Sequence, residues 1–386
     1  MELTKEEQSA LNGEKGEALQ TAYRILVATG EATNAEKLVP VNWAHLSGVN
    51  YNTIGDSGEE FLRKISQDIK VRVKTTVNPM GFDFDHISEF DHIDDDFIEK
   101  QKSIRDSYIR MGVEPTFSCT PYDIYDLPEK GTQVSFAESN AAIFANSLGG
   151  LKTNKESAFS ALASALTGKS PYSDFRKDET NYPLTIRMKL ENPNELDFGL
   201  LGFFAGKVGD TSVTISGVSE PDRRSCKALC GGMGTSGTCA KFQFRDDTET
   251  SEKIDFGKEE MNKIYDELNT TDKGDLITLG SPQLGLQELS DLSNMLKGKS
   301  FQKRCMIFCS RAVQHQARSL EYTNEIERAG GEILSDCCTC LTPLIDTNET
   351  DAVTTNSVKG ADYLKNSTGV DVNLKPLSKI IEDETK

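Results

Sequence analysis

The alternation of strands and helices between residues 274 and 340 constrains the fold more than any other feature of the chain. Strands are predicted at 274–279, 305–308 and 332–334, and the segments between them have helical periodicity. This βαβαβ order is typical of a parallel sheet covered by helices. We therefore expect a ligand site at the loops that follow the carboxyl ends of these strands.

Potential metal ligands lie where the predicted strands end: Cys119, Ser281, Cys309 and Cys338. Cys119 closes a short β-prone run that stops before Pro121, a residue that cannot continue a central strand. Thiolates gathered at one sheet edge indicate a soft-metal or iron–sulfur site. From spacing alone, buried free thiols explain the pattern equally well.

A helix predicted at 136–147 carries polar residues among small apolar ones and ends before two glycines. The polar residues are Glu138, Ser139, Asn140 and Asn146. A carboxylate in a tightly packed helix must be paired, bound to metal or functional, because burying it alone costs too much. We expect Cys119 and the start of this helix to form two walls of one site.

Length, charge and cysteine content exclude several classes of protein. A chain of 386 residues can bury the cores of two or three domains, and its net charge of −18 argues against nucleic acid or anionic membrane as a partner. Neither a signal peptide nor a membrane-spanning run is predicted. Nine irregularly spaced cysteines favour a reducing compartment, so we expect a cytoplasmic protein.

The remaining segments suggest three α/β parts. Helices are expected at 4–30 and 53–69, and a strand is expected at 70–77, directly after the second helix. We place approximate boundaries that give an N-terminal part with the pocket loops and Cys119 (1–154), a middle α/β domain (155–265) and a C-terminal βαβ domain with Ser281 and Cys338 (266–386).

Three further stretches contain residues that could bind a ligand. The acidic stretch 83–99 holds two histidines at a spacing that suits no metal site, so a solvated loop and helix start are favoured. Cys226, Cys230 and Cys239 have no histidine nearby and are interpreted as buried thiols. The glycine-rich run 231–237 is predicted to be a flexible loop, and it lacks the lysine of a phosphate-binding loop.

Short motifs in a fixed order resemble those of the aconitase X family, specifically its large subunit, over essentially the full chain. They are Gly30-Glu31-Ala32, Ala44-His45-Leu46-Ser47-Gly48-Val49, Asn78-Pro79, Cys119-Thr120-Pro121-Tyr122, Ala137-Glu138-Ser139-Asn140-Ala141, Phe144-Ala145-Asn146-Ser147, Lys152-Thr153-Asn154, Asp197-Phe198-Gly199, Ser310-Arg311, Thr355-Asn356-Ser357 and Lys359. The resemblance implies an aconitase-like arrangement of several α/β/α domains, with parallel sheets converging on a central cluster site.

The same resemblance implies an iron–sulfur-dependent hydro-lyase. Archaeal members of the family look like dehydratases of (R)-5-phosphomevalonate in the mevalonate pathway, which form trans-anhydromevalonate 5-phosphate. Bacterial members include cis-3-hydroxy-L-proline dehydratases. In both, a small swivelling subunit or fused domain supplies a serine thought to act as general base. Because no such module follows Lys359, we expect a separate small subunit and a small anionic substrate.

By resemblance, the cluster ligands would be Cys119, the position of Ser281, and Cys338. Three protein ligands leave an iron position open to act as a Lewis acid, and a 4Fe–4S cluster is favoured. Glu138 and Ser139 would orient substrate beside the iron as catalytic residues. The substrate pocket would comprise Gly48, Val49, Asn50, Asn78, Pro79, Glu138, Ser139 and Lys359. Arg311 is a second candidate for an anionic group.

The chain departs from the family pattern at the second ligand. Gly280-Ser281-Pro282-Gln283 stands where many members read Gly-Cys-Pro-His, and Asn50 stands where serine is usual. Serine is a harder and poorer cluster ligand than a thiolate, and Cys309 or one of residues 337, 338 and 340 could substitute. Two readings therefore remain: an active dehydratase, with phosphomevalonate ahead of hydroxyproline as substrate, or a cluster-free paralogue that acts as a binding partner.

Overall fold

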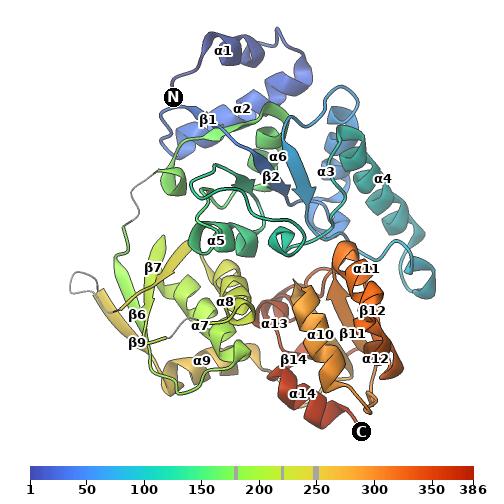
Figure 1. Ribbon diagram of the computed structural model, residues 1–386. Coiled ribbons are helices and arrows are strands. Elements are labelled where there is room, and N and C mark those ends of the chain that lie inside the picture. The colour runs from blue at the N-terminus through green and yellow to red at the C-terminus, as the bar shows by residue number, and fades with distance from the viewer. Residues whose placement is uncertain (178–180, 219–220, 247–251) are drawn as a thin grey trace.

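The computed structural model describes residues 1–177, 181–218, 221–246 and 252–386. Three α/β parts surround a common centre, with the N-terminal part at the top of Figure 1 and the middle and C-terminal parts below it. The described strands form a three-stranded, a four-stranded and a five-stranded parallel sheet, with one antiparallel pair of short strands. The expected α/β class with several parallel sheets is what the chain adopts.

The first part is built on the parallel sheet β3-β2-β4, in which β2 pairs with both neighbours. The predicted helix at 4–30 is two helices, because Gly13 and Gly16 turn the chain with φ angles of 91° and 96°. The run before Cys119 is extended but forms no strand, since Phe117 has a φ of 42°. The elements are α1 (Lys5–Leu11), α2 (Glu17–Ala32), β1 (Leu38–Pro40), β2 (Trp43–Leu46), α3 (Tyr51–Ile65), β3 (Lys74–Val77), α4 (Asp95–Met111), β4 (Ser135–Phe136), α5 (Ser139–Ser147), α6 (Ala158–Thr167) and β5 (Lys169–Pro171).

The second part contains the parallel sheet β8-β7-β6-β9 and the helix pair α7 and α8. The prediction of a flexible loop at 231–237 was wrong, because residues 231–236 continue α8. The glycines serve close packing instead: a Cβ on Gly232 would lie 2.1 Å from the carbonyl oxygen of Gly199 in α7. The elements are β6 (Leu184–Met188), α7 (Glu195–Val208), β7 (Ser212–Ser216), α8 (Arg223–Ser236), β8 (Lys241–Phe244), β9 (Glu252–Phe256) and α9 (Lys258–Leu268).

The third part is a parallel sheet of order β12-β11-β10-β13-β14. The predicted βαβαβ unit supplies its first three strands. The chain beyond Lys359 adds an edge strand and a terminal helix to this part. The elements are β10 (Leu276–Leu284), α10 (Leu286–Met295), β11 (Cys305–Cys309), α11 (Arg311–Ser319), α12 (Tyr322–Arg328), β12 (Gly331–Leu334), β13 (Ala352–Thr355), α13 (Val358–Tyr363), β14 (Asp371–Leu374) and α14 (Leu377–Glu384).

The boundary between the first two parts is best placed by packing. Helix α6 is buried in a hydrophobic cluster with α2 and α3, and β5 pairs with β1. These contacts favour a first domain that extends past residue 154 and includes β5. A larger cluster runs from Trp43 through the middle part to Leu374 and so joins all three parts, while the first and third parts each have a further cluster of their own.

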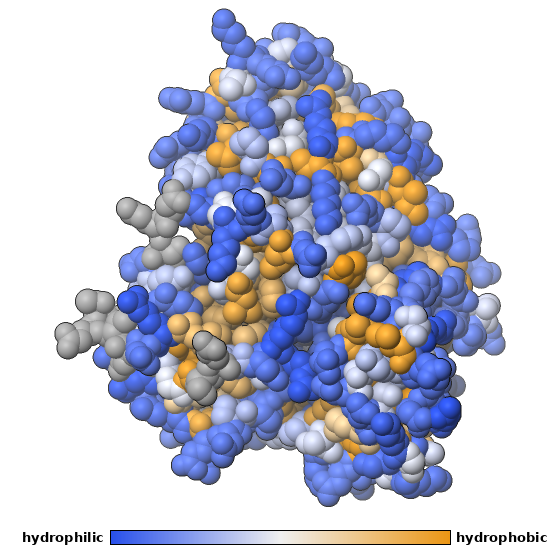
Figure 2. Space-filling view, in the orientation of Figure 1, coloured by the Kyte–Doolittle hydropathy of each residue, from blue (hydrophilic) through white to orange (hydrophobic). Residues whose placement is uncertain are grey.

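Figure 2 shows hydrophilic residues over most of one face, as the net charge of −18 leads one to expect. Among the described residues, no helix is both long and apolar enough to cross a bilayer.

Candidate active site

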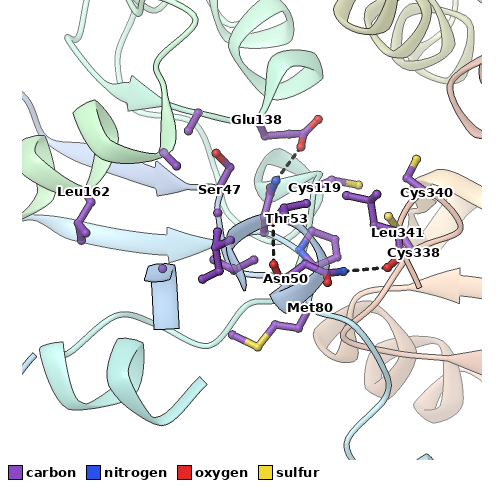
Figure 3. Close-up of a pocket in the computed structure, with 18 of the residues that line it drawn as sticks. Ser47, Asn50, Thr53, Met80, Cys119, Glu138, Leu162, Cys338, Cys340 and Leu341 are labelled. Carbon is purple, nitrogen blue, oxygen red and sulfur yellow. Dashed lines mark hydrogen bonds between the residues drawn. The ribbon is translucent and has the colours of Figure 1, made fainter. Parts of the chain in front are cut away.

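One pocket of about 720 Å³ brings together residues from the first and third parts of the chain. Almost every residue selected from the sequence lines it: Gly48, Val49, Asn50, Asn78, Pro79, Cys119, Glu138, Ser139, Cys338 and Lys359. Ser281 lines a smaller adjoining cavity instead, and neither Cys309 nor Arg311 lines the large pocket. Cys340 also lines the large pocket, although sequence reasoning named it only as one of several possible substitutes. Figure 3 shows Cys119, Cys338 and Cys340 on the same side of this pocket.

Loops after β2 and β3 build one wall. Gly48 has a φ of 72°, and a Cβ there would lie 2.7 Å from that of Ala158, so the turn after β2 requires glycine. Asn50 then caps α3 through the backbone N–H of Asn52. The side-chain amide of Asn50 also donates to the Leu341 carbonyl at 2.9 Å, which joins this wall to the loop that carries Cys338 (Figure 3).

Glu138 lies at the amino end of α5, where its carboxylate has three partners. The Lys359 ammonium lies 2.6 Å from Oε1, Asn78 donates to Oε2 at 2.7 Å, and Asn140 donates to Oε1 at 2.9 Å. Burial alone would raise the pKa of Glu138, but the charge of Lys359 and these hydrogen bonds lower it to about 2. Burial alone would lower the pKa of Lys359, but the charge of Glu138, together with those of Cys340, Tyr363 and Cys119, raises it well above its usual value. The pair is therefore ionised at neutral pH.

The two asparagines predicted in the α5 helix have structural partners. Asn140 donates to the Cys119 carbonyl and accepts from the Tyr122 hydroxyl, so it ties α5 to the Cys119 loop. Asn146 bonds the backbone of Thr153 and Ala240 and does not line the pocket.

Arg311 does not serve an anionic ligand in this pocket. Its guanidinium pairs with Asp83, Asp85 and Asp336, and it does not line the pocket. Asp83 is itself buried and accepts from the Ser335 N–H, so the acidic stretch is more than a solvated loop. The predicted role of Arg311 in binding an anionic group was wrong, because its guanidinium is paired with carboxylates where the first and third parts pack together.

The thiols differ in their surroundings. Burial, followed by the charge of Cys338, raises the pKa of Cys119 to about 12, and the Gln283 N–H donates to its sulfur at 3.3 Å. A hydrogen bond to Cys340, followed by burial, raises the pKa of Cys338. Burial opposes ionisation of Cys340, but hydrogen bonding to Cys338 and the charge of Lys359 lower its pKa. Ionisation of either of these two thiols therefore depends on the other, and a bound metal would displace the protons of its thiol ligands.

This donor set fits an iron–sulfur cluster better than a single ion. Among the described residues, no three His, Cys, Asp or Glu side chains converge to hold one metal ion. A cluster is held by thiolates that reach its separate irons, and three thiols line one pocket here. The backbone N–H that donates to Cys119 is a contact that also stabilises a ligating thiolate.

Comparison with known proteins extends over the whole chain. Family models for the first, second and third domains of aconitase X match residues 1–179, 183–267 and 274–386. The phosphomevalonate dehydratase large subunit of Methanocaldococcus jannaschii is 37% identical, with 94% of this chain and 95% of the relative covered. That of Thermococcus kodakarensis is 34% identical, with 99% and 100% covered.

Two further comparisons bear on fold and substrate. The cis-3-hydroxy-L-proline dehydratase of Pseudomonas aeruginosa is 27% identical, and the match covers 97% of this chain but 68% of that longer protein. The crystal structure of Thermococcus kodakaraensis aconitase X in its holo-form superposes with a TM-score of 0.92 at 33% identity, covering both chains completely. The resemblance and the fold class expected from the sequence are confirmed, and the chain belongs to the aconitase X family.

Proposed function

We propose that this chain is the large, catalytic subunit of an iron–sulfur-dependent hydro-lyase that dehydrates (R)-5-phosphomevalonate to trans-anhydromevalonate 5-phosphate. The observation that carries the proposal is the meeting of three thiols with the ionised Glu138–Lys359 pair in one pocket. The relatives named phosphomevalonate dehydratase large subunit match almost their full length at 28–37% identity, which supports this substrate over hydroxyproline.

A bound cluster, 4Fe–4S in our proposal, would supply Lewis acidity to the leaving hydroxyl. Cys119 and Cys338 would hold it, and a third ligand would come from Ser281 in β10 or from Cys340 in the loop after β12. Glu138 would accept a hydrogen bond from a substrate hydroxyl. With a pKa of about 2 it is a weak base, which fits an orienting role and leaves proton removal to a serine of the small subunit.

The rest of the pocket would position an anionic substrate. Ser139 begins α5, so the unpaired N–H groups at the amino end of that helix favour negative charge close to Glu138. Asn50, Asn78 and the backbone around Gly48 and Pro79 offer further hydrogen-bonding groups. Lys359 contributes its charge beside Glu138, which partly neutralises it. The name "large subunit" of the relatives supports a separate partner chain.

The experiment is anaerobic co-purification with the small subunit, followed by iron and sulfide analysis and by product detection with both candidate substrates. We expect water loss from phosphomevalonate, and Glu138→Gln should lower kcat by about 10²-fold or more, because it removes an ionised hydrogen-bond acceptor. Turnover of cis-3-hydroxy-L-proline alone would replace the substrate. Absence of both iron and turnover would favour the cluster-free binding partner.

A further inference from the structure

We infer that Cys340, and not Ser281, is the third protein ligand of the cluster beside Cys119 and Cys338. This inference rests on the proposed iron–sulfur function and revises its ligand set. It concerns a Cys-x-Cys pair, Cys338 and Cys340, in the loop that follows β12.

The first argument is which thiols reach the pocket. All nine cysteines lie in the described ranges and are free, and three of them line the large pocket: Cys119, Cys338 and Cys340. Cys309 is fully buried in the core between the C-terminal sheet and its helices. Cys337 is fully buried in the main hydrophobic cluster. Neither of these two is placed to replace a ligand.

The second argument is the position of the serine. Ser281 lines the smaller cavity, and its hydroxyl lies 2.9 Å from the Cys340 sulfur. The backbone carbonyl of Ser281 accepts from the Ser357 hydroxyl, which fixes this turn against the start of α13. The serine hydroxyl is therefore a hydrogen-bond partner of the sulfur. Between the two neighbouring atoms, the sulfur is the softer donor and the one that faces the large pocket.

The third argument is that the loop is held on both sides of Cys340. Before it, Gln283 donates from its side chain to the Cys337 carbonyl at 2.8 Å. After it, Asn50 donates to the Leu341 carbonyl at 2.9 Å, and the Thr342 hydroxyl donates to the Gly81 carbonyl at 2.7 Å. The Asn50 contact is drawn in Figure 3. These bonds hold the backbone on both sides of Cys340 in place before any metal binds, and the Cys340 side chain lines the large pocket in this position of the loop.

The test compares iron and sulfide content, the visible absorption spectrum and the EPR spectrum of full-length chains purified and reconstituted anaerobically. The variants are Cys340→Ala, Ser281→Ala and the double variant Ser281→Cys with Cys340→Ala; Cys309→Ala is the control for loss of a buried thiol. We expect Cys340→Ala to lose most of its iron and its visible absorption, and Cys119→Ala should do the same. Ser281→Ala and Cys309→Ala should retain both. The double variant should regain the cluster, because its new sulfur starts within reach of the vacated position.

Retention of iron and spectrum in Cys340→Ala, with loss in Ser281→Ala, would overturn the inference while leaving the proposed function intact. A wild-type chain that takes up no iron or sulfide would overturn both. Circular dichroism of the metal-free forms separates loss of a ligand from loss of folding, and recovery in the double variant supports the inference even if the single variant folds poorly.

Discussion

At the scale of residues, hydrogen-bond direction determines how Glu138 is held. The Glu138 carboxylate only accepts, so the Asn78 amide nitrogen donates to it at 2.7 Å and the Asn78 carbonyl oxygen lies 2.9 Å from Nε2 of His45. A neutral His45 therefore carries its proton on Nε2, which donates to that oxygen, and its Nδ1 accepts from the Thr76 hydroxyl at 2.8 Å. The Trp43 indole donates to the same hydroxyl at 2.8 Å and holds it in place. A neutral His45 is therefore part of the support of the catalytic carboxylate.

Acid should destabilise the fold through His45. Burial lowers its pKa to about 4 from an unfolded value near 6.5, so between these values the unfolded chain binds more protons and stability falls as pH falls. From about pH 7 to about pH 4.5, this one group should remove about 2–3 kcal/mol from the free energy of unfolding. Glu138 has a lowered pKa of about 2, so its contribution is lost only as pH falls below about 4.5.

Urea unfolding of the wild type and of His45→Gln at both pH values isolates this effect, since other titrating groups are common to the two chains. We expect the variant to be less stable near neutral pH and to show a shallower loss on acidification. Equal pH dependence in both chains would show that His45 does not titrate differently on folding.

Only some of the pocket residues could be predicted from the sequence. Asn78, Cys119, Glu138 and Lys359 could be selected because short motifs surround them, although their roles remain predictions. The choice between Ser281 and Cys340 could not be made, because it depends on which way two neighbouring side chains point after β10 and β12 are placed in one sheet.

At the scale of elements, α7 and α8 show why composition misled the sequence interpretation. Glycines are normally read as helix breakers, yet here they let two helix backbones touch. A Cβ on Gly202 would lie 2.2 Å from the Leu229 carbonyl oxygen, and one on Gly232 would lie 2.1 Å from that of Gly199. By contrast, β11 was predictable because it is a short, continuously apolar run between turn signals.

Gly232→Ala should destabilise the chain although alanine is the better helix former. The added methyl group meets backbone atoms that cannot rotate away, so α7 and α8 must separate, at a cost of about 1–3 kcal/mol. Thr235→Ala, on the same helix but half-buried, is the control and should cost less than about 1 kcal/mol. Chemical denaturation measures both variants. A more stable Gly232→Ala chain would show that helix propensity dominates and that the two helices have room to move.

At the scale of the whole molecule, the pocket exists only while the first and third parts stay docked, since Glu138 and Cys119 come from one and Cys338 and Lys359 from the other. The Met80 N–H donates to the Asp336 carbonyl at 2.6 Å, directly across this junction. Arg311 adds the charged contact, because its guanidinium on α11 pairs with Asp83 of the first part as well as with Asp336. Asp336 lies two residues before Cys338, so the same contact supports the ligand loop.

Removing Arg311 should therefore weaken the contact between the first and third parts and also reduce the binding of the cluster. In Arg311→Met, Asp83 and Asp336 would remain as buried carboxylates, each with 1% of its side chain exposed, without their cation. Such a loss typically costs about 3–5 kcal/mol, and we expect unfolding at lower denaturant and a lower iron content after reconstitution. Asp85→Asn is the matched control, because Asp85 pairs with the same guanidinium but is 65% exposed, so its loss should cost at most about 1 kcal/mol. Equal effects of the two substitutions would show that the buried ion pairs do not hold the two parts together. Recovery of stability when Arg311→Met is combined with Asp83→Asn would identify the unpaired buried carboxylate as the cause of the loss.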